Sequence, residues 1–523
     1  MRSEVQVKLE ERCIVQMATP RPRKKSNIGV LEILTDGVET SGLERFYTTV
    51  FGRQYYSIMP QVIAAWCRRS GHRVSYATYY GQARPESLLP DDLDVVFVAS
   101  FSKSSALAYA LAKLFRARGV ITVLGGPHGR SFPDDAQRYF DIVVVDCDQS
   151  SINDIASGKC DVGSIITCGR KAFRIPPLAE RYNDIRTASC YFGRSFRLSI
   201  VSLLTSTGCP YSCDFCTDWN NPYSLRDTGD LQADLEFAAQ RFPGRLIAFH
   251  DPNFGVNFDN TLSVLENLSP EKRNPYIVES SLSILKPKRI QRLAATNCVY
   301  LAPGIESWED YGSKAGTSGR TGNEKFSKVV EHFELLGQHL PGLQANFLIG
   351  SDADHSEESI NLTKEFILRF PNVFPVLNFP IAFGGTPMRE SLRQQDRLLP
   401  LSPIFYSNPV ITHIPKSYDP IALVSHMIDL MELTASRKLF VRRMRASISH
   451  TTRIVFSLLT LKLTSYLPEL REFSTLLKAD RTFLNFHEGR ESSIPEYYHW
   501  RLDRRLGRLA PLIPRSERQT VLC

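Results

Sequence analysis

The chain has 523 residues, of which 43% are hydrophobic and 23% are charged. These proportions are typical of a folded globular protein and exclude a disordered or fibrous chain, and the length allows two or three domains. No uncharged apolar run reaches the roughly 18 residues that a membrane-spanning helix needs. Residues 1–13 carry charges throughout and lack the apolar core of a signal peptide, so we expect a cytoplasmic protein with no transmembrane segment.

The formal net charge is +8, and it is concentrated near the C-terminal end. Residues 431–523 contain 17 Lys and Arg against 9 Asp and Glu, a surplus equal to that of the whole chain. Such a segment can contact an acidic substrate, a membrane surface or a nucleic acid, although a solvated helical face is the simpler interpretation. No RNA-binding aromatic motif accompanies the charge, so a nucleic-acid partner is not expected.

The first part of the chain alternates short apolar runs with helix-like stretches. Residues 1–27 are polar, end in a basic run and are expected to form a flexible tail. Between residues 28 and 165, helices are predicted at 57–70 and 104–119. The apolar runs predict strands at 28–34, 72–80, 94–100, 120–126 and 141–145. Because such alternation indicates parallel β-α-β units, we expect a flavodoxin-like or Rossmann-like α/β domain.

Small residues follow two of these predicted strands. Ser100 and Ser102 lie at the end of one strand, and Gly125 and Gly126 at the end of the next. Ligands of open parallel sheets bind at the carboxyl ends of the strands. Paired glycines allow close backbone approach, and serine hydroxyls supply hydrogen bonds, so these four are candidate cofactor-binding residues. The loops do not match G-x-G-x-x-G, which disfavours a dinucleotide.

The second half of the chain predicts a different α/β unit. Residues 166–197 are expected to link the two parts, and residues 198–390 contain helix patterns between apolar runs. These runs predict strands at 198–204, 245–251, 276–282, 299–307, 343–350 and 373–381. Six β-α units indicate a partial (β/α)6 barrel with its functional groups at the carboxyl ends of the strands. Residues 391–523 are expected to form a helical substrate or cap region, whose apolar segment 453–467 packs on the barrel mouth rather than on lipid.

Three cysteines directly follow the first strand of this second unit. Cys209, Cys213 and Cys216 form a C-x3-C-x2-C pattern, which can ligate three irons of a [4Fe–4S] cluster and leave the fourth iron open. Zinc is disfavoured because it usually takes four ligands and the nearest further candidate is His250. A disulfide is disfavoured because the number of closely spaced thiols is odd.

The cysteine loop, with aromatic Phe215 just before its last thiol, resembles that of radical S-adenosylmethionine (SAM) enzymes. This resemblance implies that the open iron chelates SAM, that Phe215 packs near the adenine, and that reductive cleavage yields a 5′-deoxyadenosyl radical. An external electron donor of the flavodoxin or ferredoxin type is implied as well.

The segment 123–145 resembles the end of a cobalamin-binding domain of the kind found ahead of radical SAM barrels. The chain lacks the D-x-H-x-x-G motif that supplies a cobalt ligand, and Asp146-Cys147-Asp148-Gln149 replaces the usual G-E-G-E. The resemblance therefore implies bound cobalamin without a histidine ligand from that motif, His128 included. A plain flavodoxin-like domain is the alternative interpretation.

Other strand ends resemble SAM-binding segments of the same family. Asp251, in FHDPNF, is implied to hold the SAM amino group. Glu306 and Ser307, in GIES, are implied to bind its ribose or amino-acid part, with Lys314 nearby. Asn346 lies in the strand implied to run beside the adenine. No catalytic acid or base can be assigned.

These resemblances favour a cobalamin-dependent radical SAM methyltransferase that methylates an unactivated carbon of a natural-product or lipid-like small molecule. Two alternatives remain. One is a related enzyme that uses cobalamin in a cyclisation, rearrangement or oxidation without methyl transfer. The other is a non-catalytic Fe–S or corrinoid-binding protein.

Overall fold

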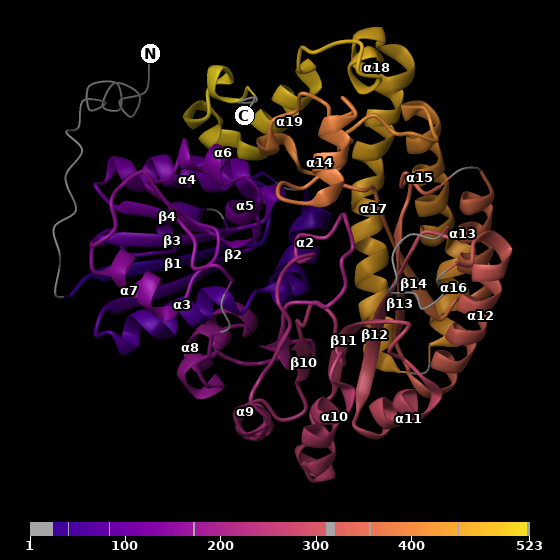
Figure 1. Cartoon of the computed structure of the whole chain (residues 1–523), viewed down its shortest axis with the longest axis horizontal. Coiled ribbons are helices and arrows are strands. Elements are labelled where there is room, and N and C mark those ends of the chain that lie inside the picture. Colours follow the sequence, from indigo (N-terminus) through magenta and orange to yellow (C-terminus); the bar gives the residue numbers. More distant parts are fainter. Residues whose placement is uncertain are drawn as a thin grey trace.

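The computed structural model describes residues 25–39, 41–82, 84–170, 173–309, 319–354, 357–447 and 449–519. Two six-stranded parallel sheets lie beside each other, each with its own helices, and the C-terminal helices pack along both (Figure 1). The predicted order of an α/β domain, a partial barrel and a helical C-terminal region is confirmed. Most of the predicted tail lies outside the described residues.

The first sheet has the strand order β2-β1-β3-β4-β5-β6, all parallel. Its order reverses between β1 and β3, which is where open sheets bind ligands. Helices α3 (Met59–Arg69) and α7 (Gln149–Ala156) cover one face, and α4 (Ser105–Ala117) covers the other. The strands are β1 (Asn27–Ile33), β2 (Arg73–Tyr79), β3 (Val95–Ser100), β4 (Ile121–Gly125), β5 (Ile142–Val144) and β6 (Ser164–Ile166). The five predicted strands are confirmed, and β6 is an additional edge strand.

The second sheet follows chain order, β7-β10-β11-β12-β13-β14, as a partial barrel does. All six predicted strands are confirmed as β7 (Ile200–Leu203), β10 (Leu246–Phe249), β11 (Tyr276–Ser281), β12 (Cys298–Glu306), β13 (Leu343–Leu348) and β14 (Val373–Asn378). The outer face packs against α9 (Thr228–Arg241), α10 (Phe258–Asn267), α11 (Pro287–Ala295), α12 (Gly322–His339) and α13 (Glu357–Arg369).

The inner face of the second sheet is covered by two helices from distant parts of the chain. Helix α2 (Gly42–Val50) and the long helix α17 (His450–Ala479) pack against each other near the centre of the molecule (Figure 1). Phe456 of α17 packs against Phe374 of β14, in a buried cluster that also holds Tyr47 and Ala248. The predicted apolar segment 453–467 lies within α17 and packs on protein. No helix of the described residues is long and apolar enough to cross a membrane.

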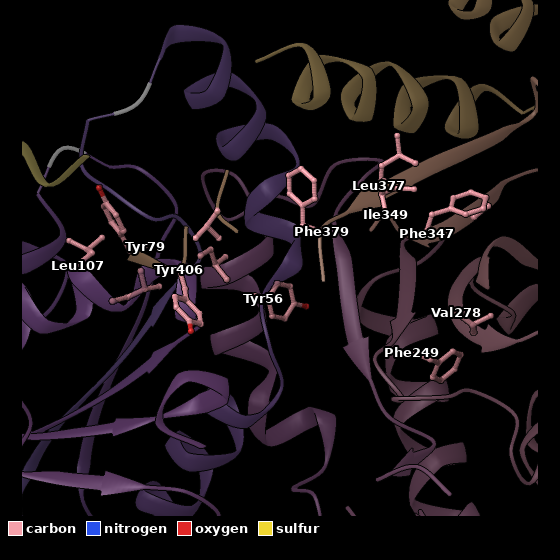
Figure 2. Close-up of a cluster of buried hydrophobic side chains, with 14 of the residues drawn as sticks. Tyr56, Tyr79, Leu107, Phe249, Val278, Phe347, Ile349, Leu377, Phe379 and Tyr406 are labelled. Atoms are coloured by element: carbon pink, nitrogen blue, oxygen red, sulfur yellow. The ribbon is translucent and has the colours of Figure 1, made fainter. Parts of the chain in front are cut away.

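A continuous apolar core joins the two sheets. Figure 2 shows side chains from both, and one buried cluster includes all the labelled residues and reaches the C-terminal helices. Tyr56 lies between the sheets, where its hydroxyl donates to the Ile200 carbonyl (2.7 Å) and accepts from the Ser202 amide (3.1 Å). The first strand of the barrel is therefore hydrogen-bonded directly to the first domain.

The connecting segment and the basic C-terminal region are both ordered where the structure describes them. The expected linker 166–197 contains α8 (Leu178–Ser189), which packs on α3 and on α9. The C-terminal region begins after α14 (Pro387–Gln394). Besides α17, it contains α15 (Pro420–Ala435), α16 (Arg437–Ala446), α18 (Arg481–His487) and α19 (Glu496–Leu506). Several arginines here serve packing rather than a solvated face: Arg501 is buried and donates to the Pro409 carbonyl (2.5 Å).

Candidate functional site

The cysteine loop leaves the carboxyl end of β7 and closes on itself. Cys209 and Cys213 are buried and Cys216 is half-buried. The Cys216 amide donates to the Cys213 carbonyl (3.1 Å), and the Cys209 amide donates to the Asn221 carbonyl (3.1 Å). Gly208 has a φ of 71°, and a Cβ there would lie far inside 3.0 Å of the Pro222 carbonyl. The tight turn before the first thiol therefore requires glycine.

The donor set of this loop fits an iron–sulfur cluster with one open iron. None of the three cysteines forms a disulfide among the described residues, and they lie within eight residues of each other. Among the described residues no group of three His, Cys, Asp or Glu side chains already converges as a metal site. Metal binding often completes such sites, so the cluster itself would draw the three sulfurs together. Phe215 is half-buried in the same loop.

Asp251 joins the end of β10 to the start of the cysteine loop. It is buried, and its Oδ1 accepts hydrogen bonds from the Thr205 hydroxyl (2.6 Å), the Ser206 amide (2.6 Å) and the Ser206 hydroxyl (2.7 Å). The Thr205 amide lies within 3.1 Å of both carboxylate oxygens. Burial raises the pKa of Asp251, and these hydrogen bonds oppose the shift. The carboxylate thus holds the backbone from which the cysteine loop departs.

Glu306 and Ser307 lie together at the carboxyl end of β12. Glu306 has a φ of 66°, and its carboxylate folds back over Gly304, where a Cβ would collide with Oε1. Ser307 is buried and donates to Asp354 Oδ1 (2.6 Å). Asp354 also accepts from the Gly350 amide (3.2 Å), which ties the ends of β12 and β13 together. Lys314, the other residue expected in this segment, lies outside the described residues.

A row of polar side chains lines the inner face of the barrel. Tyr300 donates to Gln344 Oε1 (3.1 Å), and Gln344 Nε2 donates to Asn346 Oδ1 (2.6 Å). After β10, His250 Nε2 lies 3.0 Å from the hydroxyl of Ser202 in β7. Burial lowers the pKa of His250 to about 4 although the side chain keeps accessible surface.

The carboxyl edge of the first sheet brings its four candidate residues together. Gly126 has a φ of 86°, and a Cβ there would lie 3.2 Å from the backbone of Ser100. A Cβ on Gly125 would meet nothing within 4 Å, so open space lies beside it. Ser102 is buried and its hydroxyl lies 3.1 Å from His128 Nδ1.

His128 faces the core and not this edge. Its Nε2 lies 2.6 Å from the Tyr109 hydroxyl, and that hydroxyl donates to Asp135 (2.7 Å). Burial lowers the pKa of His128 to about 3. Both ring nitrogens are therefore engaged by Tyr109 and Ser102, and the histidine is held neutral.

The cysteine loop and the first sheet meet across a small polar interface. Arg130, in the helix that follows Gly126, pairs with Asp218 (2.9 Å), two residues after Cys216. The Trp219 indole donates to the Gly385 carbonyl (2.8 Å). The backbone of Gly384 lies so close to the carbonyl oxygen of Ser131 that a Cβ at position 384 would overlap it. These contacts place the loop of thiols beside the glycine-bearing edge of the first domain.

Sequence reasoning missed several residues of this arrangement. Asp354 links the carboxyl ends of β12 and β13, and Tyr300 with Gln344 links the first halves of the same strands. Arg130 with Asp218 joins the two domains. The alternation of polar residues along β13, with Gln344 and Asn346 two apart, was the available signal for an inward-facing polar row.

Comparisons with known proteins agree with this architecture. Two methyltransferases of Chlorobaculum tepidum are similar in sequence. Bacteriochlorophyllide d C-8(2)-methyltransferase is 26% identical over 321 residues, 58% of this chain and 69% of the relative. Bacteriochlorophyllide d C-12(1)-methyltransferase is 25% identical over 329 residues, 60% of this chain and 70% of the relative. No protein-family model matches the chain.

Solved structures show the same fold at low sequence identity. The cobalamin-dependent SAM radical enzyme OxsB, with aqua-cobalamin bound, aligns with a TM-score of 0.54 and 12% identity over 95% of this chain and 82% of its own. The radical SAM methyltransferase TsrM from Kitasatospora setae, with cobalamin and a [4Fe–4S] cluster, gives 0.52 and 14% over 75% and 78%.

The chain therefore shares its fold, two parallel sheets with the three-thiol loop at their junction, with solved cobalamin-dependent radical SAM enzymes. In sequence the chain is similar to the two methyltransferases, and in fold it is similar to these two solved enzymes.

Proposed function

We propose that the chain is a cobalamin-dependent methyltransferase that methylates an unactivated carbon of a small natural-product or lipid-like molecule. The observation that carries this proposal is the contact between the cysteine loop and the glycine-bearing edge of the first sheet, through Arg130 and Asp218. A cluster site and a corrinoid site would share one enclosed space there. The known activities of the Chlorobaculum tepidum relatives, both carbon methyltransferases by name, support the same reaction class.

In this proposal, the residues at the strand ends of the barrel bind the cluster and SAM. Cys209, Cys213 and Cys216 would hold the cluster, and Phe215 would flank the adenine of SAM. Asp251 would fix the loop and, through its less engaged Oδ2, remain able to accept a hydrogen bond from the SAM ammonium. The cofactors would supply the electron transfer, hydrogen abstraction and methyl donation.

The remaining candidates would position the cofactors. Glu306 and Ser307 lie at the carboxyl end of β12, and Asn346 lies within the adjacent strand β13, opposite Gly304. There they would bind the ribose and adenine side of SAM. Cobalamin would bind at the carboxyl edge of the first sheet, in contact with Ser100, Ser102, Gly125 and Gly126. Because His128 is buried on two partners, cobalt would bind without it. A flavodoxin or ferredoxin in the cytoplasm would be the electron donor.

The proposal is tested with anaerobically reconstituted protein, hydroxocobalamin, a strong reductant and SAM. We expect about four irons in this cluster, bound corrinoid and release of 5′-deoxyadenosine. Cys213→Ala should abolish both the cluster and SAM cleavage. Cys160→Ala, which changes a half-buried thiol of the first domain, should retain both. Protein that takes up zinc instead of iron, or no corrinoid, would contradict the proposal.

Methyl transfer is separated from the other cobalamin-assisted reactions by product mass. With methyl-deuterated SAM, we expect a cell-extract product that gains three deuterons, together with S-adenosylhomocysteine. A product that forms with 5′-deoxyadenosine but gains no labelled methyl would indicate cyclisation, rearrangement or oxidation instead.

A further inference from the structure

Two segments that are far apart in the sequence meet at the amino-terminal end of the barrel. One is residues 185–198, which lead into β7, and the other is α16 with the first half of α17. Arg197 Nε donates to the Thr451 hydroxyl (3.2 Å), which joins the two segments. A Cβ on Gly342, directly before β13, would lie 3.2 Å from the Thr452 hydroxyl. Helix α17 therefore begins beside the first residues of the barrel strands.

This end of the barrel carries positive charge without acidic side chains in the same segments. Residues 185–198 and 433–468 contain no Asp or Glu. The exposed cations are Arg194, Arg197, Arg437, Lys438, Arg442 and Arg445. In the part of the chain that the structure describes, none of these six forms an ion pair, whereas Arg369 of α13 pairs with Glu334 of α12 (2.7 Å). Because like charges without counter-ions repel each other, such a surface is suited to a partner rich in anionic groups.

Phe192 projects from this surface at the tip of a strained turn. The backbones of Tyr191 and Arg194 exchange two hydrogen bonds (2.9 and 2.8 Å), so Phe192 and Gly193 are the central residues of a tight hairpin. Phe192 has a φ of 48°, a region that is unfavourable for a bulky side chain. Tyr191 packs on Phe196, which anchors the turn, but Phe192 itself is 104% exposed. Packing within the chain therefore does not account for this conformation.

Other apolar side chains lie singly among the cations. One exposed face of α16 consists of Lys438, Val441, Arg442 and Arg445. Val441 is 39% exposed, and Ile454 in the first turns of α17 is 40% exposed. Leu368, whose carbonyl accepts a hydrogen bond from Arg442 Nη2 (3.1 Å), is 46% exposed. A protein partner usually covers a contiguous apolar centre, whereas single apolar side chains between arginines suit the interface of a bilayer.

The position of this surface also disfavours the electron donor as its partner. The cysteine loop leaves the carboxyl end of β7, whereas residues 192–197 precede its amino end. The six residues of β11 give the barrel a depth of about 20 Å. A donor bound at the amino-terminal end would be separated from the thiols by the length of the barrel. A membrane with anionic lipids offers phosphates to the arginines and an apolar layer to Phe192.

We propose that this basic rim, formed by Phe192, Arg194, Arg197, Val441, Arg442 and Arg445, binds the surface of a membrane that contains anionic lipids. The arginines contact the lipid phosphates, and Phe192 enters the boundary between the headgroups and the acyl chains. The assignment goes beyond the proposed function and does not depend on it, because the rim lies at the other end of the barrel from the cysteine loop.

The test is sedimentation of the full chain with vesicles of phosphatidylcholine, either alone or mixed with phosphatidylglycerol. We expect binding to the mixed vesicles only, and weaker binding in added salt because exposed charges are screened. Arg442→Gln combined with Arg445→Gln should weaken binding about 30-fold, as expected for two charges near an anionic bilayer. Phe192→Ala should weaken it about tenfold, and Phe192→Trp should preserve it, because tryptophan also favours the bilayer interface.

A matched control lies at the other end of α17. Arg481 is exposed directly after this helix, whose 30 residues place it about 45 Å from His450. Arg481→Gln should therefore leave vesicle binding unchanged. Equal binding to both kinds of vesicle, or unchanged binding in the double arginine variant, would overturn the proposal. Unchanged binding in Phe192→Ala would overturn it as well, because the rim would then be a purely electrostatic site for an acidic protein or a nucleic acid.

Release of 5′-deoxyadenosine without vesicles separates this proposal from the proposed function. The substituted side chains are exposed and lie away from the carboxyl ends of the barrel strands, so we expect every variant to match the unmodified chain. A chain that binds the mixed vesicles but never cleaves SAM would refute the proposed function and leave the basic rim standing. A chain that cleaves SAM but binds neither kind of vesicle would refute the membrane assignment alone.

Discussion

Asp251 is the single side chain on which the start of the cysteine loop depends most. Four donors from Thr205 and Ser206 converge on its carboxylate. Asp251→Ala would leave these buried donors without an acceptor, at a cost of about 3 kcal/mol. We expect a lower unfolding midpoint in urea and a large loss of iron after anaerobic reconstitution.

The control for this change is another aspartate of the same β-α unit. Asp259 pairs with Arg292, but its side chain is 73% exposed, so Asp259→Ala should cost at most about 1 kcal/mol. Full iron content in Asp251→Ala would show that the loop reaches its conformation without the carboxylate. A selective loss of SAM affinity with normal iron would instead assign Asp251 to the SAM ammonium alone.

At the residue scale, the sequence predicts which side chains can bind a cofactor better than it predicts which residues those side chains contact. The spacing of Cys209, Cys213 and Cys216 identifies three donors on one loop because the ligands are neighbours in the chain. The role of Asp251 depends on the register of β10 against β7, which no local pattern contains.

At the scale of elements, strands that are long and buried on both faces are the predictable ones. The run IGVLEIL and the six apolar runs of the barrel all form strands, because a parallel sheet covered by helices needs continuous apolar segments. Edge strand β6 has only three residues, one of them exposed, so it carries little signal. Helix α8 has few apolar residues, and it is the tertiary contacts with α3 and α9 that order it.

Helix α17 covers the inner face of the barrel, and a substitution in its buried face measures how much this packing stabilises the protein. Phe456 is fully buried there, 5.8 Å from Phe374 and 6.4 Å from Tyr300 between ring centres. Phe456→Ala should lower the free energy of unfolding by about 3–5 kcal/mol, because the cavity cannot collapse between a helix and a sheet. Ile454→Ala, two residues earlier and 40% exposed, should change it by about 0.5 kcal/mol. Similar midpoints for both variants in urea unfolding would show that α17 is not part of the barrel core.

At the scale of the whole molecule, the proposed chemistry requires the two domains to stay docked. The ion pair between Arg130 and Asp218 contributes little by itself, since both side chains are 28% exposed and such pairs are worth at most about 1 kcal/mol. The closer contact is between Gly384 and the backbone carbonyl of Ser131, where no Cβ fits. A backbone oxygen cannot rotate away, so Gly384→Ala must move either the turn or the helix after Gly126.

We therefore expect Gly384→Ala to increase hydrogen exchange in residues 126–131 and 384–390 and to weaken corrinoid binding, while the barrel core remains protected. Gly385→Ala is the matched control: its φ of 73° implies strain of about 1 kcal/mol, but a Cβ there meets nothing within 4 Å. Exchange in 126–131 should then match that of the unmodified chain. If both alanine variants exchange alike, backbone strain rather than domain contact governs this turn. If exchange in 126–131 increases only in Gly384→Ala, the close approach of the Gly384 backbone to the Ser131 carbonyl sets the spacing of the two domains.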